Sequence, residues 1–281
     1  MVFSFHHLKV DFMGNDKWVL VPTDFGKLKD ILFSWQEGMA AHNAWNAVFW
    51  CNHDQPRVVS RFGDEGEYWT ESAKMLANIV HAMRGTPYVY QGEELGMTNA
   101  NFTRLDQYRD VESLNHFQIL RDKGMSEEIV YNILKVHSRD NSRTPMQWDA
   151  TAQGGFTTGE PWISVNPNTA TINAQAQVED KDSIFAHYQA LIRLRHTYDV
   201  FAQGDFTPLT PGHPAVLAYQ RKYQGQELIC VSNFYRKECV WKAPVALDGY
   251  RVLLSNYSDS EPKAQWTLRP YESVLLLKET H

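Results

Sequence analysis

The chain has 281 residues, which is enough for one large domain or two of ordinary size. Because 43% of the residues are hydrophobic and 21% are charged, we expect a buried core and not a disordered chain. A net charge of -6 without a basic block argues against nucleic acid or an anionic membrane as a partner.

The sequence also carries few signs of export or membrane insertion. No apolar run approaches the roughly 20 residues that a membrane helix needs. Residues 1–10 lack the charged start and the long apolar stretch of a signal peptide. The cysteines are odd in number and far apart, which favours reduced thiols, and we therefore expect a cytoplasmic location. They are Cys51, Cys230 and Cys239.

The first hundred residues alternate between helix and strand signals. Apolar residues at helical spacing predict one helix that begins after Asp24 and stops near Gly38, and another that begins after Thr70 and stops at Gly85. Apolar strand-like runs occupy residues 1–5, 46–52 and 86–91. Helices and strands in alternation predict a parallel sheet that is covered by helices.

The pattern changes twice further along the chain. Residues 98–181 are polar and irregular, with one amphipathic helix expected at 126–137, and a second helix is expected at 182–197. Beyond residue 201 the sequence contains short strand-like runs separated by turn residues, and "KYQGQE" (222–227) is typical of a hairpin turn. The runs are 215–221, 227–234, 238–243, 250–255 and 272–278. We expect a small antiparallel sheet there.

The number of strands before residue 200 restricts the fold. A (β/α)8 barrel has eight strands and needs around 250 residues. Only three strand-like runs precede residue 200, so this part is either a small open sheet or the last part of a barrel. The alternation by itself leaves both possibilities open.

Several motifs resemble one enzyme family. "NHDQPR" (52–57), which follows a buried apolar run, resembles the seventh-strand motif of the α-amylase clan of glycoside hydrolases, in its α-glucosidase branch. The segments 61–99, "SRDNSRTPMQW" (138–148), "GGFTTGEPW" (154–162) and "YQALIRLR" (188–195) continue the resemblance in order. It implies an α/β fold: the last strands and helices of a TIM (β/α)8 barrel, incomplete in this chain, over residues 1–200, and a C-terminal antiparallel β-domain over 201–281.

The same resemblance implies a reaction. Retaining glycosidases use two carboxyl groups, a nucleophile and an acid/base. A third acid, here Asp54, stabilises the transition state by holding sugar hydroxyls, and His53 beside it donates to a hydroxyl. The alternative for Asp54 is a turn cap that pairs with Arg57. The nucleophile and the acid/base belong to the fourth and fifth strands, which the resemblance places before "MVFSF", so we expect the isolated chain to be inactive.

Further residues are candidates for substrate binding. Arg139 and Arg143 resemble residues that reach the sugar pocket, although they could instead brace a long loop. Glu112 resembles an acid at the pocket entrance, and its alternative is a helix cap. Lys9 and Lys17 could bind a phosphate group or could be ordinary solvated surface.

Two features of the sequence carry no chemical prediction. The adjacent histidines 6 and 7 lack the neighbours that a metal site needs, so we expect no metal and no cofactor. Glu93 and Glu94 follow the expected strand 86–91, but in the family they are not the catalytic pair. The expected site therefore depends on Asp54 and on residues that the chain brings to it.

The substrate expectation rests on "FHHLKVDF" (5–12) and on Trp50-Cys51. These residues resemble the branch of the family that hydrolyses trehalose 6-phosphate to glucose and glucose 6-phosphate. The alternative within enzymes is an oligo-1,6-glucosidase. A different class of function is a non-catalytic carbohydrate-binding remnant, or one half of a split enzyme that binds a separate N-terminal half of the barrel.

Overall fold

The computed structural model describes residues 1–280. Its helices are α1 (Phe25–Ala41), α2 (Val58–Phe62), α3 (Trp69–His81), α4 (Val111–Asp122), α5 (Glu127–His137), α6 (Ala174–Glu179), α7 (Ile184–Thr197) and α8 (Val200–Gln203). Its strands are β1 (Val2–Phe3), β2 (Asn46–Val48), β3 (Thr86–Pro87), β4 (Thr207–Pro208), β5 (Val216–Tyr223), β6 (Gln226–Asn233), β7 (Cys239–Lys242), β8 (Arg251–Ser255), β9 (Gln265–Leu268) and β10 (Ser273–Glu279). Within this described part, no helix is long and apolar enough to span a membrane.

The N-terminal strands form a parallel sheet in the order β1-β2-β3, as the alternation predicts. They are shorter than expected, because pairing stops at Val48 and Pro87 although both apolar runs continue. The amide of Tyr88 donates to Val48 O at 2.9 Å, and the two strands do not pair beyond this bond. Gly85 has a φ of +136°, and a Cβ there would lie 2.5 Å from Asn46 O, so only glycine allows β3 to approach β2.

The helix boundaries follow local capping. Asp24 accepts a hydrogen bond from the amide of Lys27 at 2.9 Å, which confirms the predicted start of α1, but α1 continues past Gly38 to Ala41. The predicted N-cap Thr70 is wrong, because α3 begins at Trp69. The Asp64 carboxylate accepts from the amide of Gly66 at 2.7 Å, and this turn brings the chain into the helix early.

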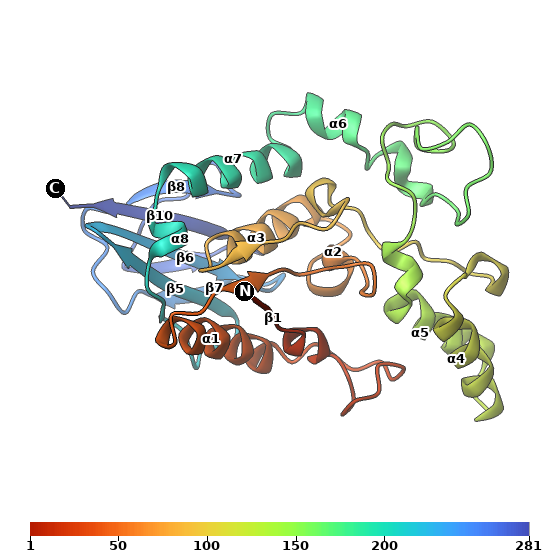
Figure 1. Ribbon diagram of the computed structural model, residues 1–281. Helices are drawn as coiled ribbons and strands as arrows, with labels where there is room; N and C mark the ends of the chain where they lie inside the picture. Colours follow the sequence, from red (N-terminus) through yellow and green to blue (C-terminus); the bar gives the residue numbers. More distant parts are fainter. Residues whose placement is uncertain (281) are drawn as a thin grey trace.

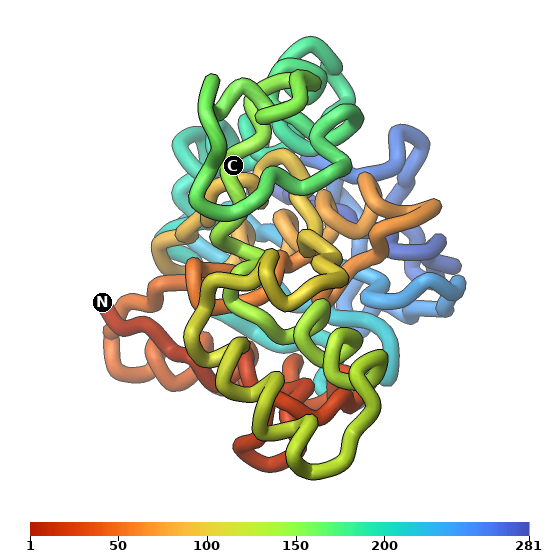
Figure 2. Tube along the Cα trace, turned by 90° about the vertical axis from the view of Figure 1, so that its right-hand side faces the viewer, coloured from red at the N-terminus to blue at the C-terminus, as the bar shows by residue number. Residues whose placement is uncertain are grey.

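The polar region contains more regular structure than its sequence indicates. The expected helix is present as α5, with Ser126 as its N-cap. α4 and α6 were not expected; α4 buries only Ser113 and Leu120, so its apolar periodicity is weak. α4 and α5 pack with Trp18 in a separate hydrophobic cluster. They lie on the side of the molecule away from the C-terminal strands (Figure 1), and Figure 2 shows this region in front.

The C-terminal strands form an antiparallel sheet in the order β4-β5-β6-β10-β8. The predicted hairpin is confirmed: Gln224 and Gly225 both have positive φ, 44° and 81°, as a type I′ turn requires. One face of this sheet shares a core with α1 and α3, and the other packs against the β7–β9 pair. The sheet therefore fixes the helices that support β1–β3.

Candidate functional site

The loop after β2 carries a carboxylate at the C-terminal end of that strand. The residues before it, from Ala47 to Cys51, are buried. The side chain of Asn52 accepts a hydrogen bond from the amide of Asp54 at 2.8 Å, which folds the chain into a tight turn. This turn leaves the Asp54 side chain 42% exposed, so its carboxylate is accessible to a ligand.

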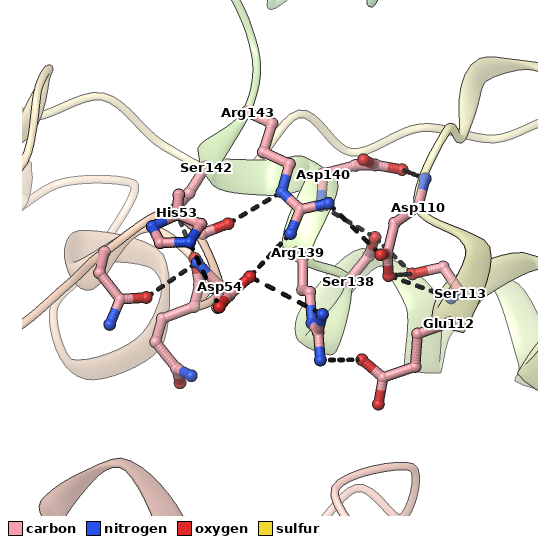
Figure 3. Close-up of polar contacts among 12 residues, drawn as sticks. His53, Asp54, Asp110, Glu112, Ser113, Ser138, Arg139, Asp140, Ser142 and Arg143 are labelled. Carbon is pink, nitrogen blue, oxygen red and sulfur yellow. Dashed lines mark hydrogen bonds and ion pairs between the residues drawn. The ribbon is translucent and has the colours of Figure 1, made fainter. Parts of the chain in front are cut away.

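Two arginines from a distant segment reach this carboxylate (Figure 3). Arg143 Nη2 lies 2.7 Å from Asp54 Oδ1, and its Nε donates to His53 O at 2.9 Å. Arg139 Nη1 lies 3.7 Å from the same oxygen of Asp54. A planar guanidinium can hold several oxygens at fixed positions, so Arg143 also fixes the loop that carries His53.

A second carboxylate continues the charge network toward α4. Glu112 Oε2 forms an ion pair with Arg139 Nη2 at 2.8 Å and accepts a hydrogen bond from Lys17 Nζ at 2.7 Å. Burial lowers the pKa of Lys17, and the hydrogen bond that Lys17 donates to Glu112 opposes this shift. Glu112 is not the cap of its helix, because Asp110 accepts from the amide of Ser113 at 3.1 Å and fills that role. Glu112 therefore joins two cations in one site.

Asp54, Arg139, Glu112 and Lys17 line one open cavity of about 860 Å³, within the size range of small-molecule sites, whereas His53 and Arg143 are not among its lining residues. Its wall includes an aromatic stack in which the ring of His116 lies 4.5 Å from that of Trp18. The Lys17 ammonium lies 4.6 Å from the centre of the Trp18 ring. The lining residues are Phe5, Phe12, Met13, Asn15, Asp16, Lys17, Trp18, Asn52, Asp54, Gln55, Glu112, His116 and Arg139.

The structure brings most of the expected site residues together. His53 is exposed, and its Nε2 lies 3.4 Å from Asp54 Oδ2. Arg139, Arg143, Glu112 and Lys17 are linked to Asp54 directly or through one another. Lys9 is different: it is exposed at the end of a 3-10 helix (His6–Lys9) and lines a separate cavity beside α1. The site therefore contains one of the two expected lysines.

Arg57 does not pair with Asp54; instead it hydrogen-bonds to the backbone of two loops beside the site. Its side chain is buried, its Nε donates to Asn141 O at 3.1 Å, and another nitrogen donates to Gln91 O. These bonds fix the segment that carries both site arginines against the loop after β3. Sequence reasoning missed this role, because the partners are backbone carbonyls 84 and 34 residues away.

Asp140 and Asp110 are further residues that the sequence did not reveal. Asp140 Oδ2 accepts from the amides of Arg109 and Asp110 at 2.7 and 2.9 Å. Asp110 in turn lies 3.3 Å from Arg143 Nη1. This chain of contacts determines where Arg143 points. The sequence signal for Asp140 was the alternation of charges in "SRDNSR" (138–143), and Asp110 lies outside that motif.

A buried ion pair anchors the cavity wall on its N-terminal side. Arg61 Nε lies 2.7 Å from Asp11 Oδ2, and Arg61 also donates to Leu8 O at 2.6 Å. Both charged side chains are nearly inaccessible to water. Because a buried charge needs its partner, this pair ties the segment before Lys17 to α2.

Glu93 lies in the core and does not line the cavity. Its Oε1 accepts from the hydroxyl of Tyr188 at 2.9 Å, and burial raises the pKa of Glu93 to about 8. The pKa of Glu94 is also raised by burial. Both therefore differ from Asp54, which faces the cavity and two arginines.

Comparison with known proteins identifies the family of the chain. The family model described as Alpha amylase, catalytic domain, matches residues 1–204, and that described as Maltogenic Amylase, C-terminal domain, matches residues 206–275. The trehalose-6-phosphate hydrolase of Bacillus subtilis (strain 168) is 53% identical over 98% of this chain and 50% of its own length. The oligo-1,6-glucosidase of Halalkalibacterium halodurans is 46% identical over 99% of this chain and 50% of its own length.

A solved structure of a relative is also closely similar to the whole chain. The trehalose-6-phosphate hydrolase of Bacillus licheniformis superposes with a TM-score of 0.97 at 47% identity, covering 100% of this chain and 51% of that protein. The chain thus spans about half the length of the relatives it matches.

Proposed function

The chain belongs to the alpha-amylase family, and we propose that it forms one wall of the active site of a retaining α-glucosidase acting on trehalose 6-phosphate. The products would be glucose and glucose 6-phosphate. The observation that carries this proposal is the continuous ion-pair network from Asp54 through Arg139 and Glu112 to Lys17, within one cavity. The second half of the enzyme, which supplies the nucleophile and the acid/base, is part of the proposal.

Asp54 is proposed to act on the sugar ring that is cleaved. Its carboxylate would accept hydrogen bonds from ring hydroxyls and stabilise the positive charge that develops in the transition state. His53 would donate to a hydroxyl of the same ring. Arg143 would position Asp54, because it binds both the carboxylate and the loop that carries it.

Lys17 is proposed to recognise the phosphate of the second sugar. It faces the cavity at the far end of the network from Asp54, and an ammonium group is a compact charge for phosphate. Glu112 would hold Lys17 and Arg139 in place in the absence of substrate. Lys9 lies in a different cavity, so the phosphate proposal rests on Lys17.

Two further assignments belong to the same proposal. Residues 1–200 would be the barrel part and residues 201–281 the β-domain, which share one hydrophobic core through α1 and α3. A cytoplasmic location is supported by the three free cysteines, which suit a reducing compartment.

An oligo-1,6-glucosidase is the second candidate, because several relatives of that name are 40–46% identical to this chain. It differs from the first candidate in one requirement. A site built for trehalose 6-phosphate needs the phosphate, and a site for α-1,6-linked oligosaccharides does not. Dependence on phosphate therefore separates the two.

The test uses this chain joined, ahead of residue 1, to the half of the Bacillus subtilis relative that it does not match. The fused enzyme is assayed with trehalose 6-phosphate, trehalose and isomaltose, beside the chain alone. We expect kcat/KM for trehalose 6-phosphate to exceed that for trehalose at least tenfold, and Lys17→Met to remove this preference. Equal or better hydrolysis of isomaltose would reject the proposal in favour of the second candidate.

A further inference from the structure

A histidine of α4 lies beside the lysine that is proposed to bind the phosphate. His116 lines the same cavity as Lys17, and both contact Trp18. The His116 ring stacks on the Trp18 ring with a distance of 4.5 Å between centres and an angle of 19° between planes. Lys17 Nζ lies 4.6 Å from the centre of the Trp18 ring. The face of an indole ring stabilises a cation placed over it, so Trp18 suits a positive charge on either neighbour.

A hydrogen bond within α4 determines which ring nitrogen of His116 carries a proton. Nδ1 lies 2.9 Å from the backbone carbonyl oxygen of Glu112. A carbonyl oxygen can only accept, so Nδ1 is the donor and holds the single proton of the neutral ring. Among residues 1–280 the ring makes no second hydrogen bond, which leaves Nε2 free for a ligand. Only the imidazolium form has an N–H group at Nε2.

The charges around Lys17 do not fully match a phosphate group. A phosphate monoester carries nearly two negative charges near neutral pH and has three acceptor oxygens. Lys17 supplies one positive charge, and Glu112 lies 2.7 Å from it. Arg139 shares Glu112 at 2.8 Å and lies 3.7 Å from Asp54. A further cationic donor beside Lys17 would therefore strengthen the binding of a dianion.

Several charged groups share the cavity wall with His116. α5 packs against α4 but gives no residue to this wall within the described part of the chain. Because carboxylates and cations both surround the ring, the effect of its protonation is measured best by replacing the ring itself. The groups are Asp16 and Lys17 before α1, Asp54 after β2, Glu112 on α4 and Arg139 after α5.

We propose that His116 is a second, pH-dependent ligand of the substrate phosphate: protonated Nε2 donates to one phosphate oxygen while Lys17 binds another. This inference rests on the proposed function, because it adds a residue to the same site. The stack on Trp18 and the bond to the Glu112 carbonyl hold the ring in position. Histidine changes charge near neutral pH, so the affinity for phosphate falls as pH rises and the ring becomes neutral. The affinity for sugars without phosphate does not change with it.

The test is calorimetric binding of glucose 6-phosphate, the proposed product that carries the phosphate, to the fused enzyme, with glucose as the reference ligand. Binding is measured at pH 6.5 and pH 8.5, because a phosphate monoester is mainly dianionic at both. The Kd of the parent should rise roughly threefold or more between the two pH values.

Two variants of His116 separate the stack from the donor. His116→Phe keeps an aromatic ring and loses the donor, so the Kd at pH 6.5 should rise roughly tenfold, as for a lost hydrogen bond to a charged group. At pH 8.5 the same variant should differ from the parent much less. His116→Gln supplies an amide donor that does not titrate, and its Kd should be nearly equal at the two pH values.

His42→Phe is the matched control. His42 is exposed at the end of α1, and its Nδ1 lies 2.8 Å from Gly38 O, which is the same kind of bond within a helix. It does not line the cavity, so its replacement should leave the Kd unchanged at both pH values. Thermal melts of all variants identify any that unfold, and His116→Gln carries the test if His116→Phe does.

The outcomes separate the role of His116 from the proposed function. Equal Kd values for the parent and His116→Phe at pH 6.5 would overturn the inference, and so would a pH dependence that persists in both His116 variants. If those variants also keep the preference for trehalose 6-phosphate over trehalose and its KM, the proposed function stands without His116. Binding of glucose 6-phosphate that depends on His116, in an enzyme that hydrolyses isomaltose better, would keep the phosphate ligand and reject the proposed substrate.

Discussion

The loops that follow β2 and β3 each carry a carboxyl group near the end of a parallel strand, and the two groups have opposite surroundings. Asp54 is 42% exposed and contacts two arginines, whereas Glu93 is 5% exposed and accepts a hydrogen bond from the hydroxyl of Tyr188. Burial raises the pKa of Glu93 to about 8. The comparison teaches that position at a strand end does not decide the surroundings of a carboxyl group; packing around the loop and the presence of cationic neighbours do.

The largest expected effect tests the Asp54 side of this comparison. In the fused enzyme, Asp54→Asn keeps the shape but removes the charge, and hydrolysis of trehalose 6-phosphate should fall roughly a thousandfold. Steady-state kinetics measure the change. Asp106→Asn is the control, because Asp106 is exposed and pairs with Arg104, and it should leave the rate unaltered. A loss of less than tenfold for Asp54→Asn would remove Asp54 from the reaction.

A smaller effect is expected for the arginine that positions Asp54. Lysine cannot reproduce the fork by which Arg143 contacts Asp54, Asp110 and the carbonyl of His53, so kcat/KM of Arg143→Lys should fall roughly tenfold to a hundredfold. The free energy of unfolding should change by less than about 1 kcal/mol, because partly exposed ion pairs contribute little. Kinetics and thermal melts of the same samples measure both quantities.

The control for this variant is Arg104→Lys, which alters an exposed arginine outside the site. Unfolding of Arg143→Lys at a much lower temperature than the parent would show that Arg143 holds the fold and does not mainly position Asp54.

The smallest expected effect concerns Glu93 and depends on pH. The folded protein holds the Glu93 proton up to about pH 8, while the unfolded chain releases it near the ordinary glutamate pKa. In that interval the folded state binds more protons, so its stability falls as pH rises. Glu93→Gln cannot titrate and should gain about 1 kcal/mol or more relative to the parent between pH 5 and pH 9.

Urea unfolding of the chain at several pH values measures this difference. Glu179→Gln, an exposed glutamate at the end of α6, is the matched control and should follow the parent at every pH. Parallel curves for the parent and Glu93→Gln would show that burial does not hold the proton.

Much of the architecture was predictable from short stretches of sequence. Capping by Asp24, the parallel order implied by alternating helices and strands, and the Gln224-Gly225 hairpin all depend on residues close together in the chain. The lengths of the strands were less predictable, because β2 and β3 end where they stop pairing with each other and not where the apolar runs end. α4 went unpredicted because its apolar periodicity is weak, and β9 went unpredicted because its alternating pattern covers only four residues.

The site divides in the same way. The sequence by itself singled out Asp54, the two arginines, Glu112 and two lysines by their motifs. Only the tertiary structure decided that Lys17 and not Lys9 shares the cavity with Asp54, that Arg57 is a buried support, and that Glu93 is desolvated. The physical reason is distance along the chain: Arg143 contacts Asp54 across 89 residues, and Tyr188 contacts Glu93 across 95. Burial and pairing over such separations arise from packing of the whole fold, which local periodicity and capping do not encode.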